Sequence, residues 1–80
     1  MTLAEAIARI EPIFRDLFDE YDGPVTANLT ARDVEQWDSL ANVQLIVMVE
    51  KAFSVKFASS DIKSMKNLGA LAELVVAKSR

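Results

Sequence analysis

Apolar residues recur every three or four positions along the first part of the chain, which is the spacing of one face of an α-helix. Thr2 and Glu5 have the spacing of a capping box, so this helix is predicted to begin near residue 3. We expect Pro12 on its solvent side, with a kink at residues 8–12 or loosely held first turns. Residues 22–24, Asp-Gly-Pro, are predicted to end it. The apolar stripe consists of Leu3, Ile7, Ile10, Phe14, Leu17 and Tyr21, and Phe18 widens it.

A second helix is predicted over residues 39–53, because apolar residues continue there without alternation for too long to form a strand. It carries a core-facing group and, beside it, a second apolar strip. The strip has two interpretations, a helix at the centre of a bundle or a surface that meets partner proteins. For Val43 and Val47 taken alone, a helix at the centre of a bundle is the preferred interpretation. The core-facing group is Leu45, Ile46, Val49 and Phe53, and the second strip is Leu40, Val43 and Val47.

Two further helices are predicted toward the C-terminus. Residues 59–61, Ser-Ser-Asp, offer caps for a short helix that ends near Met65, and Asn67 can cap a last helix over residues 68–78. Gly69 weakens the first turn of the last helix slightly. Lys78 and Arg80 lie where cations interact favourably with the helix dipole. The buried face of the last helix is predicted to contain Leu68, Leu71, Ala72, Leu74 and Val75.

The long connection over residues 22–38 lacks periodicity. Thr30 and Asp33 have the spacing of one short turn. Loops longer than about 12–15 residues are uncommon in compact domains and are often functional. The predicted fold is therefore all-α, a four-helix bundle of three main helices plus one short helix, with a long first loop that leads to Ser39. The apolar residues that anchor this loop are Val25, Leu29, Val34 and Trp37.

The composition excludes several classes of function. The 80 residues are expected to form one domain, residues 1–80, with a small core. The net charge of −3 argues against nucleic acid as a partner. No apolar stretch is long enough to span a membrane, and the first residues lack the pattern of a signal peptide. A cytoplasmic monomer is expected.

Intrinsic catalysis is not expected. The chain has no Cys and no His, which removes thiolate zinc sites and the most common general base. No residue is an obvious activating base for a serine, and two glycines are too few for a phosphate-binding loop. Asp33, Glu35 and Asp38 can bind a hard cation in principle, but they lack the spacing of a calcium loop. Neither a catalytic residue nor a metal site is therefore predicted.

Residues 38–53 resemble the signature of acyl carrier proteins. They read DSLANVQLIVMVEKAF, and the family pattern is D-S-L-x-x-V-x-L-hydrophobic-x-x-x-E-x-x-F. The order of a helix, a long loop, a helix that starts at a serine, a short helix and a final helix is also similar to the architecture of this family. The resemblance therefore covers the whole chain.

The resemblance implies a covalent modification. In this family a phosphopantetheinyl transferase uses coenzyme A to attach 4′-phosphopantetheine to the serine, here Ser39, and the terminal thiol then carries an acyl group as a thioester. The other implied partners are an acyl-loading ligase or acyltransferase and a downstream synthase or transferase. Asp38 is expected either to assist recognition by the transferase or to cap the helix, and Leu40 to contact partners. The chain is then expected to be a carrier and not an enzyme.

The chain departs from the strongly acidic fatty-acid carriers of this family. Gln44 and Lys51 replace acidic residues, so Glu50 is the only acid inside the predicted second helix, and Trp37 replaces a small residue. These departures predict weak coupling to fatty-acid enzymes and a specialised stand-alone carrier for a lipid or polyketide-type pathway. An equally good interpretation is that Gln44 and Lys51 lie on an ordinary solvated helix face. The predicted partner-binding residues are Trp37, Val43, Gln44, Val47, Glu50 and Lys51.

The cargo is not defined by the sequence. A space between the helices can hold an acyl chain, although an ordinary core is the preferred interpretation of its candidate residues. Two other functions stay open: a peptidyl or D-alanyl carrier, which holds an aminoacyl thioester, and an unmodified helical module that docks a partner helix through Val43 and Val47. The candidate acyl-lining residues are Leu45, Val49, Ile62, Leu68 and Leu71.

Overall fold

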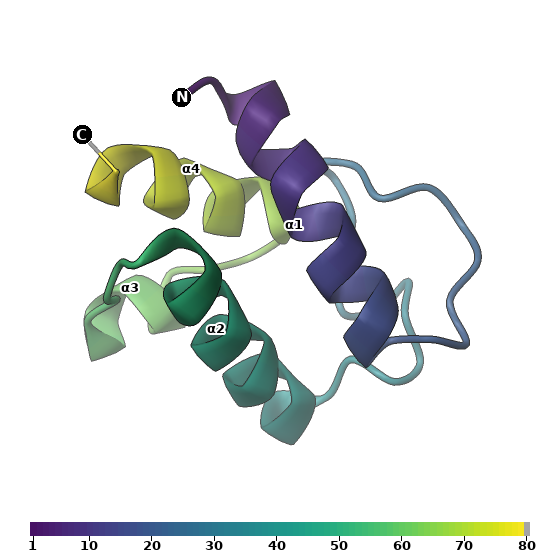
Figure 1. Cartoon of the computed structure of the whole chain (residues 1–80). Helices are drawn as coiled ribbons and strands as arrows, with labels where there is room; N and C mark the ends of the chain where they lie inside the picture. The colour runs from purple at the N-terminus through teal and green to yellow at the C-terminus, as the bar shows by residue number, and fades with distance from the viewer. Residues whose placement is uncertain (80) are drawn as a thin grey trace.

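The computed structural model describes residues 1–79, so the expectation for Arg80 lies outside the described residues. Four helices form in this range, and α1 packs against both α2 and α4 (Figure 1). Residues 1–79 contain no strand. The predicted all-α bundle of three main helices plus one short helix is therefore confirmed. The helices are α1 (Leu3–Leu17), α2 (Ser39–Phe53), α3 (Ser59–Lys63) and α4 (Leu68–Lys78).

The capping box at the start of α1 is present. The Glu5 N–H donates to Thr2 Oγ1 at 3.1 Å, and the Thr2 N–H donates to Glu5 Oε1 at 3.0 Å. The Thr2 N–H first, and then the Thr2 hydroxyl, lower the pKa of the Glu5 carboxyl below its ordinary value. The helix continues through Pro12, whose side chain is exposed as predicted. It ends at Leu17 and not at residues 22–24, because Phe18 leaves the helical conformation with φ −109° and ψ 66°.

The buried face of α1 is rotated from the predicted stripe. Its centre follows a spacing of four residues, and it includes Ala6, which the sequence pattern omits. Leu3 is 38% exposed, and Ile7, Leu17 and Tyr21 are only partly buried. Phe18, predicted to widen the stripe, is almost fully buried because it packs on Trp37 from the long loop. The fully or almost fully buried residues of this face are Ala6, Ile10, Phe14 and Phe18.

The predicted bounds of α2 are confirmed. Leu45, Ile46 and Val49 are buried, but Phe53 is only partly buried, and the Arg9 guanidinium lies 4.5 Å from its ring centroid. The second apolar strip is exposed, with Leu40 at 71%, Val43 at 55% and Val47 at 41%. The interpretation of this strip as the centre of a bundle is therefore wrong. In this structure the strip faces solvent.

The long loop, now residues 18–38, is tied to the start of α4. The Leu68 N–H donates to the Leu29 carbonyl at 2.8 Å, and the Gly69 N–H donates to the Ala27 carbonyl at 2.9 Å. Gly69 allows this approach, because a Cβ atom there would lie 2.8 Å from the Ala27 carbonyl oxygen. Asn67 caps α4 as predicted. The loop anchors Leu29, Val34 and Trp37 are buried, and Val25 is partly buried.

The cap of α3 differs from the prediction. Ala58 is the residue before the helix, and its N–H donates to Asp61 Oδ2 at 2.9 Å, so Ser59 and Ser60 do not act as the cap. Asp61 also pairs with Lys78 of α4 at 3.2 Å. The Ala58 N–H first, and then Lys78, lower the pKa of Asp61 below its ordinary value. None of the helices within residues 1–79 has the length and apolar character to cross a membrane.

Candidate functional site

Ser39 is the first residue of α2, and its side chain is exposed. The residue that caps the helix is Asp38, whose Oδ1 accepts from the Ala41 N–H at 2.8 Å. Within residues 1–79 the Ser39 hydroxyl has no hydrogen-bond partner. Capping is therefore assigned to Asp38 alone, and the Ser39 hydroxyl is free to react.

The first turn of α2 also leaves backbone donors unused. The N–H groups of Asp38, Ala41 and Asn42 have acceptors, but those of Ser39 and Leu40 have none among the described residues. They lie at the positive end of the helix dipole. Free N–H groups at this end of a helix form a site for an anion such as a phosphate. The surroundings of the Ser39 hydroxyl are thus complementary to a covalently bound phosphodiester.

Trp37 lies inside the molecule directly before this turn. The residue is 6% exposed, and its indole packs against Phe14, with ring centroids 5.3 Å apart, and against Phe18, with ring centroids 5.9 Å apart. The indole Nε1–H donates to Asn42 Oδ1 at 2.9 Å. This burial and this hydrogen bond argue against the predicted contact between Trp37 and partner proteins.

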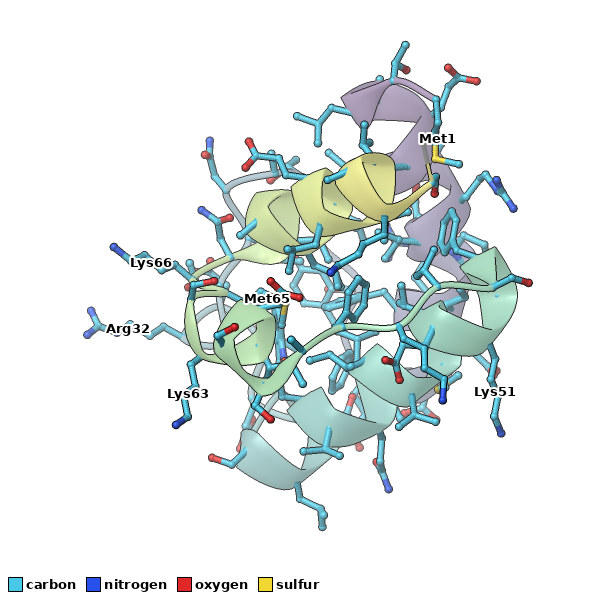
Figure 2. All side chains as sticks on the ribbon, turned by 90° about the vertical axis from the view of Figure 1, so that its left-hand side faces the viewer. Met1, Arg32, Lys51, Lys63, Met65 and Lys66 are labelled. Atoms are coloured by element: carbon cyan, nitrogen blue, oxygen red, sulfur yellow. The ribbon has the colours of Figure 1, made fainter. Side chains whose placement is uncertain are left out.

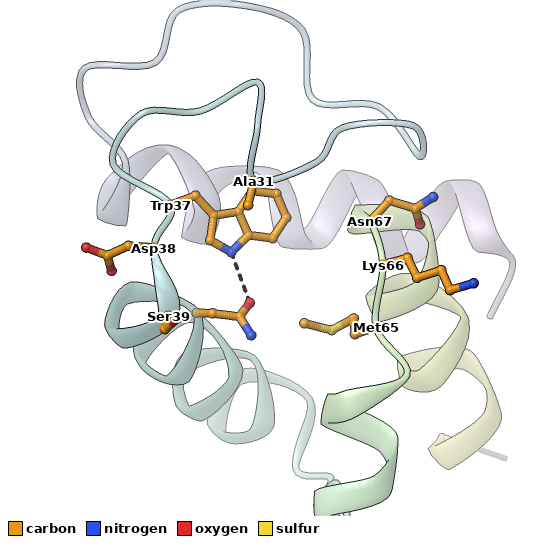
Figure 3. A pocket seen from close by; sticks show the side chains of 8 residues that line it. Ala31, Trp37, Asp38, Ser39, Met65, Lys66 and Asn67 are labelled. Carbon is orange, nitrogen blue, oxygen red and sulfur yellow. Dashed lines mark hydrogen bonds between the residues drawn. The ribbon is translucent and has the colours of Figure 1, made fainter.

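A cavity of about 360 Å³ adjoins Ser39. It lies between the start of α2, the end of the long loop and the segment that joins α3 to α4 (Figure 3). Sequence reasoning missed Asn42, Met65, Lys66 and Asn67 as neighbours of Ser39, because they come from distant segments or carry no motif. The lining residues are Ala31, Trp37, Asp38, Ser39, Asn42, Met65, Lys66 and Asn67.

The candidate acyl-lining residues do not border this cavity. Leu45, Val49, Leu68 and Leu71 are fully buried within the core cluster. Ile62 is partly exposed and is not among the residues that pack against that cluster. The structure therefore places four of the five in the core and none of them beside Ser39.

The exposed side of α2 carries little negative charge. Gln44 and Lys51 are exposed, and their contact with partners stays a prediction. Glu50 is partly buried, and its Oε2 accepts from the Phe57 N–H at 2.8 Å. One oxygen of the Glu50 carboxylate thus holds the chain after α2, and partner binding by Glu50 stays a prediction. Glu50 is the one acidic residue within residues 39–53.

The acidic residues of the long loop do not form a metal site. The Asp33 carboxylate accepts from the Thr30 N–H at 3.0 Å and from the Thr30 hydroxyl at 3.2 Å, which forms the predicted turn. Across residues 1–79 no three His, Cys, Asp or Glu residues gather closely enough to hold a metal ion. The chemistry that the site supports is acceptance of a covalent anionic group at Ser39.

Comparison with known proteins agrees with this geometry. Residues 2–75 match the sequence family described as the phosphopantetheine attachment site. The chain is also similar to the solution NMR structure of holo acyl carrier protein from Geobacter metallireducens, with 40% sequence identity and a TM-score of 0.83 over 91% of this chain and 84% of that chain. No curated protein shows a significant match.

Proposed function

We propose that this chain, which belongs to the acyl carrier protein family, carries acyl groups on a 4′-phosphopantetheine arm attached to Ser39. The arm supplies the thiol that forms a thioester with the acyl group. The observation that carries the proposal is the exposed Ser39 hydroxyl, which has no hydrogen bond and stands beside the free N–H groups of Ser39 and Leu40. These groups fit the phosphodiester of the arm.

Attachment of the arm requires a second protein. The Ser39 oxygen forms a bond to the β-phosphorus of coenzyme A, 3′,5′-ADP leaves, and the hydroxyl proton must pass to a base. The chain has no His and no Cys, so a phosphopantetheinyl transferase provides that base. Asp38 is committed to the Ala41 N–H and holds Ser39 at the start of the helix.

The chain acts as a carrier domain over residues 1–80 and not as a catalyst. Its further partners are an acyl-loading ligase or acyltransferase and a downstream synthase or transferase. The exposed strip of Leu40, Val43 and Val47 supports docking of these enzymes beside Ser39. The presence of a single acidic residue on α2, together with exposed Gln44 and Lys51, favours partners other than enzymes with strongly basic docking surfaces. This supports a specialised lipid or polyketide-type pathway.

The attachment site can be tested by intact mass measurement after incubation with coenzyme A and a broad-specificity phosphopantetheinyl transferase. We expect the wild-type chain to gain one phosphopantetheine and Ser39→Ala to gain none. Ser59→Ala is a matched control, because Ser59 is also an exposed first residue of a helix, and it should be modified like the wild type. A wild-type chain that stays unmodified while a known carrier is converted would refute the proposal.

A further inference from the structure

A groove lies at the C-terminal end of α2, the end opposite Ser39. It has a volume of about 470 Å³ and shares no lining residue with the cavity beside Ser39. Val47 and Val55 give it apolar surface, and Val55 is buried although it does not belong to the main core cluster. The lining residues are Val47, Glu50, Lys51, Ser54, Val55 and Lys56.

One wall of this groove, residues 54–57, is held in place by hydrogen bonds to Glu50. The Glu50 carbonyl accepts from the Ser54 N–H and from the Val55 N–H, the latter at 3.1 Å. Its Oε2 accepts from the Phe57 N–H at 2.8 Å. Ser54 has a φ of 56°, the left-handed conformation that ends a helix. Because these backbone groups are tied within the chain, the groove is formed before any partner binds.

Two lysines border the groove without an ion-pair partner. Lys51 and Lys56 are exposed, and neither pairs with a carboxylate within residues 1–79. Figure 2 shows Lys51 extending outward from α2. The carboxylate that lines the groove belongs to Glu50, and its Oε2 is already engaged. The groove therefore carries net positive charge, although the whole chain has a net charge of −3.

The groove continues the exposed apolar strip of α2. Leu40, Val43, Val47 and Lys51 follow one another at spacings of three and four residues, so they lie along one side of the helix. Lys51 follows Ser39 by twelve residues in this helix, which is about 18 Å along its axis. A partner that covers the strip while it acts at Ser39 therefore reaches the groove with a segment of this length.

We propose that the groove docks an acidic amphipathic helix of the partner enzyme. The inference rests on the proposed function, because this partner acts on the group that Ser39 carries. Apolar side chains of the helix cover Val43 and Val47, and its carboxylates meet Lys51 and Lys56. A basic helix is disfavoured because it brings like charges together. An uncharged helix is disfavoured because it covers the two ammonium groups without replacing their hydration.

The first test uses two synthetic helical peptides with the same leucine positions, one with Glu and the other with Lys at the flanking positions. Each is titrated into the full ¹⁵N-labelled chain and followed by NMR. We expect the acidic peptide to bind about tenfold more tightly, with the largest amide shifts at residues 43–57. The net charge of −3 favours the basic peptide, so overall charge does not produce this preference. Equal binding of the two peptides, or tighter binding of the basic one, would overturn the inference.

Charge reversal tests the two lysines. Lys51→Glu and Lys56→Glu should each weaken binding of the acidic peptide by about two- to tenfold, because an attraction becomes a repulsion. Lys63→Glu is the matched control, because Lys63 is exposed and lies outside the groove, on the other edge of the molecule from Lys51 in Figure 2. An equal loss in Lys63→Glu would show a response to overall charge and contradict the proposal.

Vesicles distinguish a protein partner from a lipid surface, because an apolar strip beside lysines also suits anionic headgroups. The chain is mixed with vesicles of phosphatidylcholine, with or without phosphatidylglycerol, and the vesicles are floated by centrifugation. We expect the chain to stay unbound in both cases. Flotation with the anionic vesicles that is lost in Lys51→Glu would assign the groove to a membrane surface and overturn the inference.

Modification of Ser39 is measured separately, by intact mass after treatment with the transferase and coenzyme A. If Ser39 is modified but the acidic peptide is not preferred, the docking inference fails while the proposed function stands. If Ser39 stays unmodified while a known carrier is converted, the proposed function fails, and an enzyme partner for the groove fails with it.

Discussion

The Trp37 indole donates to Asn42 Oδ1 at 2.9 Å and thereby links the end of the long loop to the first turns of α2. Trp37 also packs on two phenylalanines of the core, so this contact connects the core to the turn that presents Ser39. The residues between the two partners, Asp38 to Ala41, are held from both ends. The position of the reactive hydroxyl is therefore set by buried groups, although the hydroxyl itself is exposed.

Replacing Asn42 by Ala should lower the free energy of unfolding by about 1–3 kcal/mol, because it leaves the largely buried indole N–H without an acceptor. Urea denaturation followed by circular dichroism measures this loss. Asn42→Asp retains an acceptor oxygen and should cost less. A loss in Asn42→Ala below about 0.5 kcal/mol would show that water replaces the acceptor at no cost.

Replacing Gly69 by Ala should destabilise the bundle by about 1–3 kcal/mol, because the added Cβ overpacks the contact with the loop. That atom would lie 2.8 Å from the Ala27 carbonyl oxygen and 2.9 Å from the Ala27 Cβ. Helix propensity acts in the opposite direction by about 1 kcal/mol. Denaturation of the single variants and of the double variant Ala27→Gly/Gly69→Ala measures the coupling. A more stable Gly69→Ala protein would mean that the loop moves away easily.

Asp61 should make stability depend on pH in the acidic range. Its pKa is lowered in the folded chain by the Ala58 N–H and by Lys78, so the folded state binds this proton less readily than the unfolded state. Its contribution is therefore complete above the unfolded pKa of about 3.9 and is lost as the pH falls through the folded pKa. Wild type and Asp61→Asn should differ in urea midpoint near neutral pH and converge in acid. Asp22→Asn, at an exposed loop position, is the control and should show no such difference from wild type. A difference in urea midpoint between wild type and Asp61→Asn that persists in acid would exclude this mechanism.

Replacing Val43 by Asp should weaken docking without unfolding the protein. Val43 is 55% exposed, so the change in the free energy of unfolding should stay within about 0.5 kcal/mol. Burial of an aspartate against a partner should reduce kcat/KM of the phosphopantetheinyl transferase by about tenfold. Ala8→Asp adds the same charge at an exposed position of α1 and serves as the control. Equal rates for Val43→Asp and wild type would exclude this strip from the transferase interface.

The helices with strong local signals are the ones that the sequence predicts best. The starts of α2 and α4 follow from Asp38 and Asn67, whose side chains cap the helices that they precede. The end of α1 is predicted too late. Phe18 and Tyr21 continue the helical spacing, but Phe18 is buried by contact with Trp37 outside the helix.

The candidate site is predicted only in part, because its walls come from separate segments. Ser39 and Asp38 belong to one motif and are found from it. Met65 and Asn67 become neighbours of Ser39 only after α2 and the segment before α4 have folded together, whereas Asn42 lies one turn after Ser39 in α2. The role of Trp37 also depends on tertiary contacts, which turn an unusual residue beside the motif into part of the core.

The hydrogen bonds from Leu68 and Gly69 to the long loop have a consequence for protein synthesis. The acceptors, the carbonyls of Leu29 and Ala27, are synthesised roughly forty residues before their donors. These carbonyls therefore lack their donors until the start of α4 has been synthesised. Buried backbone groups rarely stay unpaired in a folded protein. The turn that displays Ser39 is thus completed late in translation. We expect a nascent chain that ends before residue 67 to be a poor transferase substrate, although its modification motif is already complete.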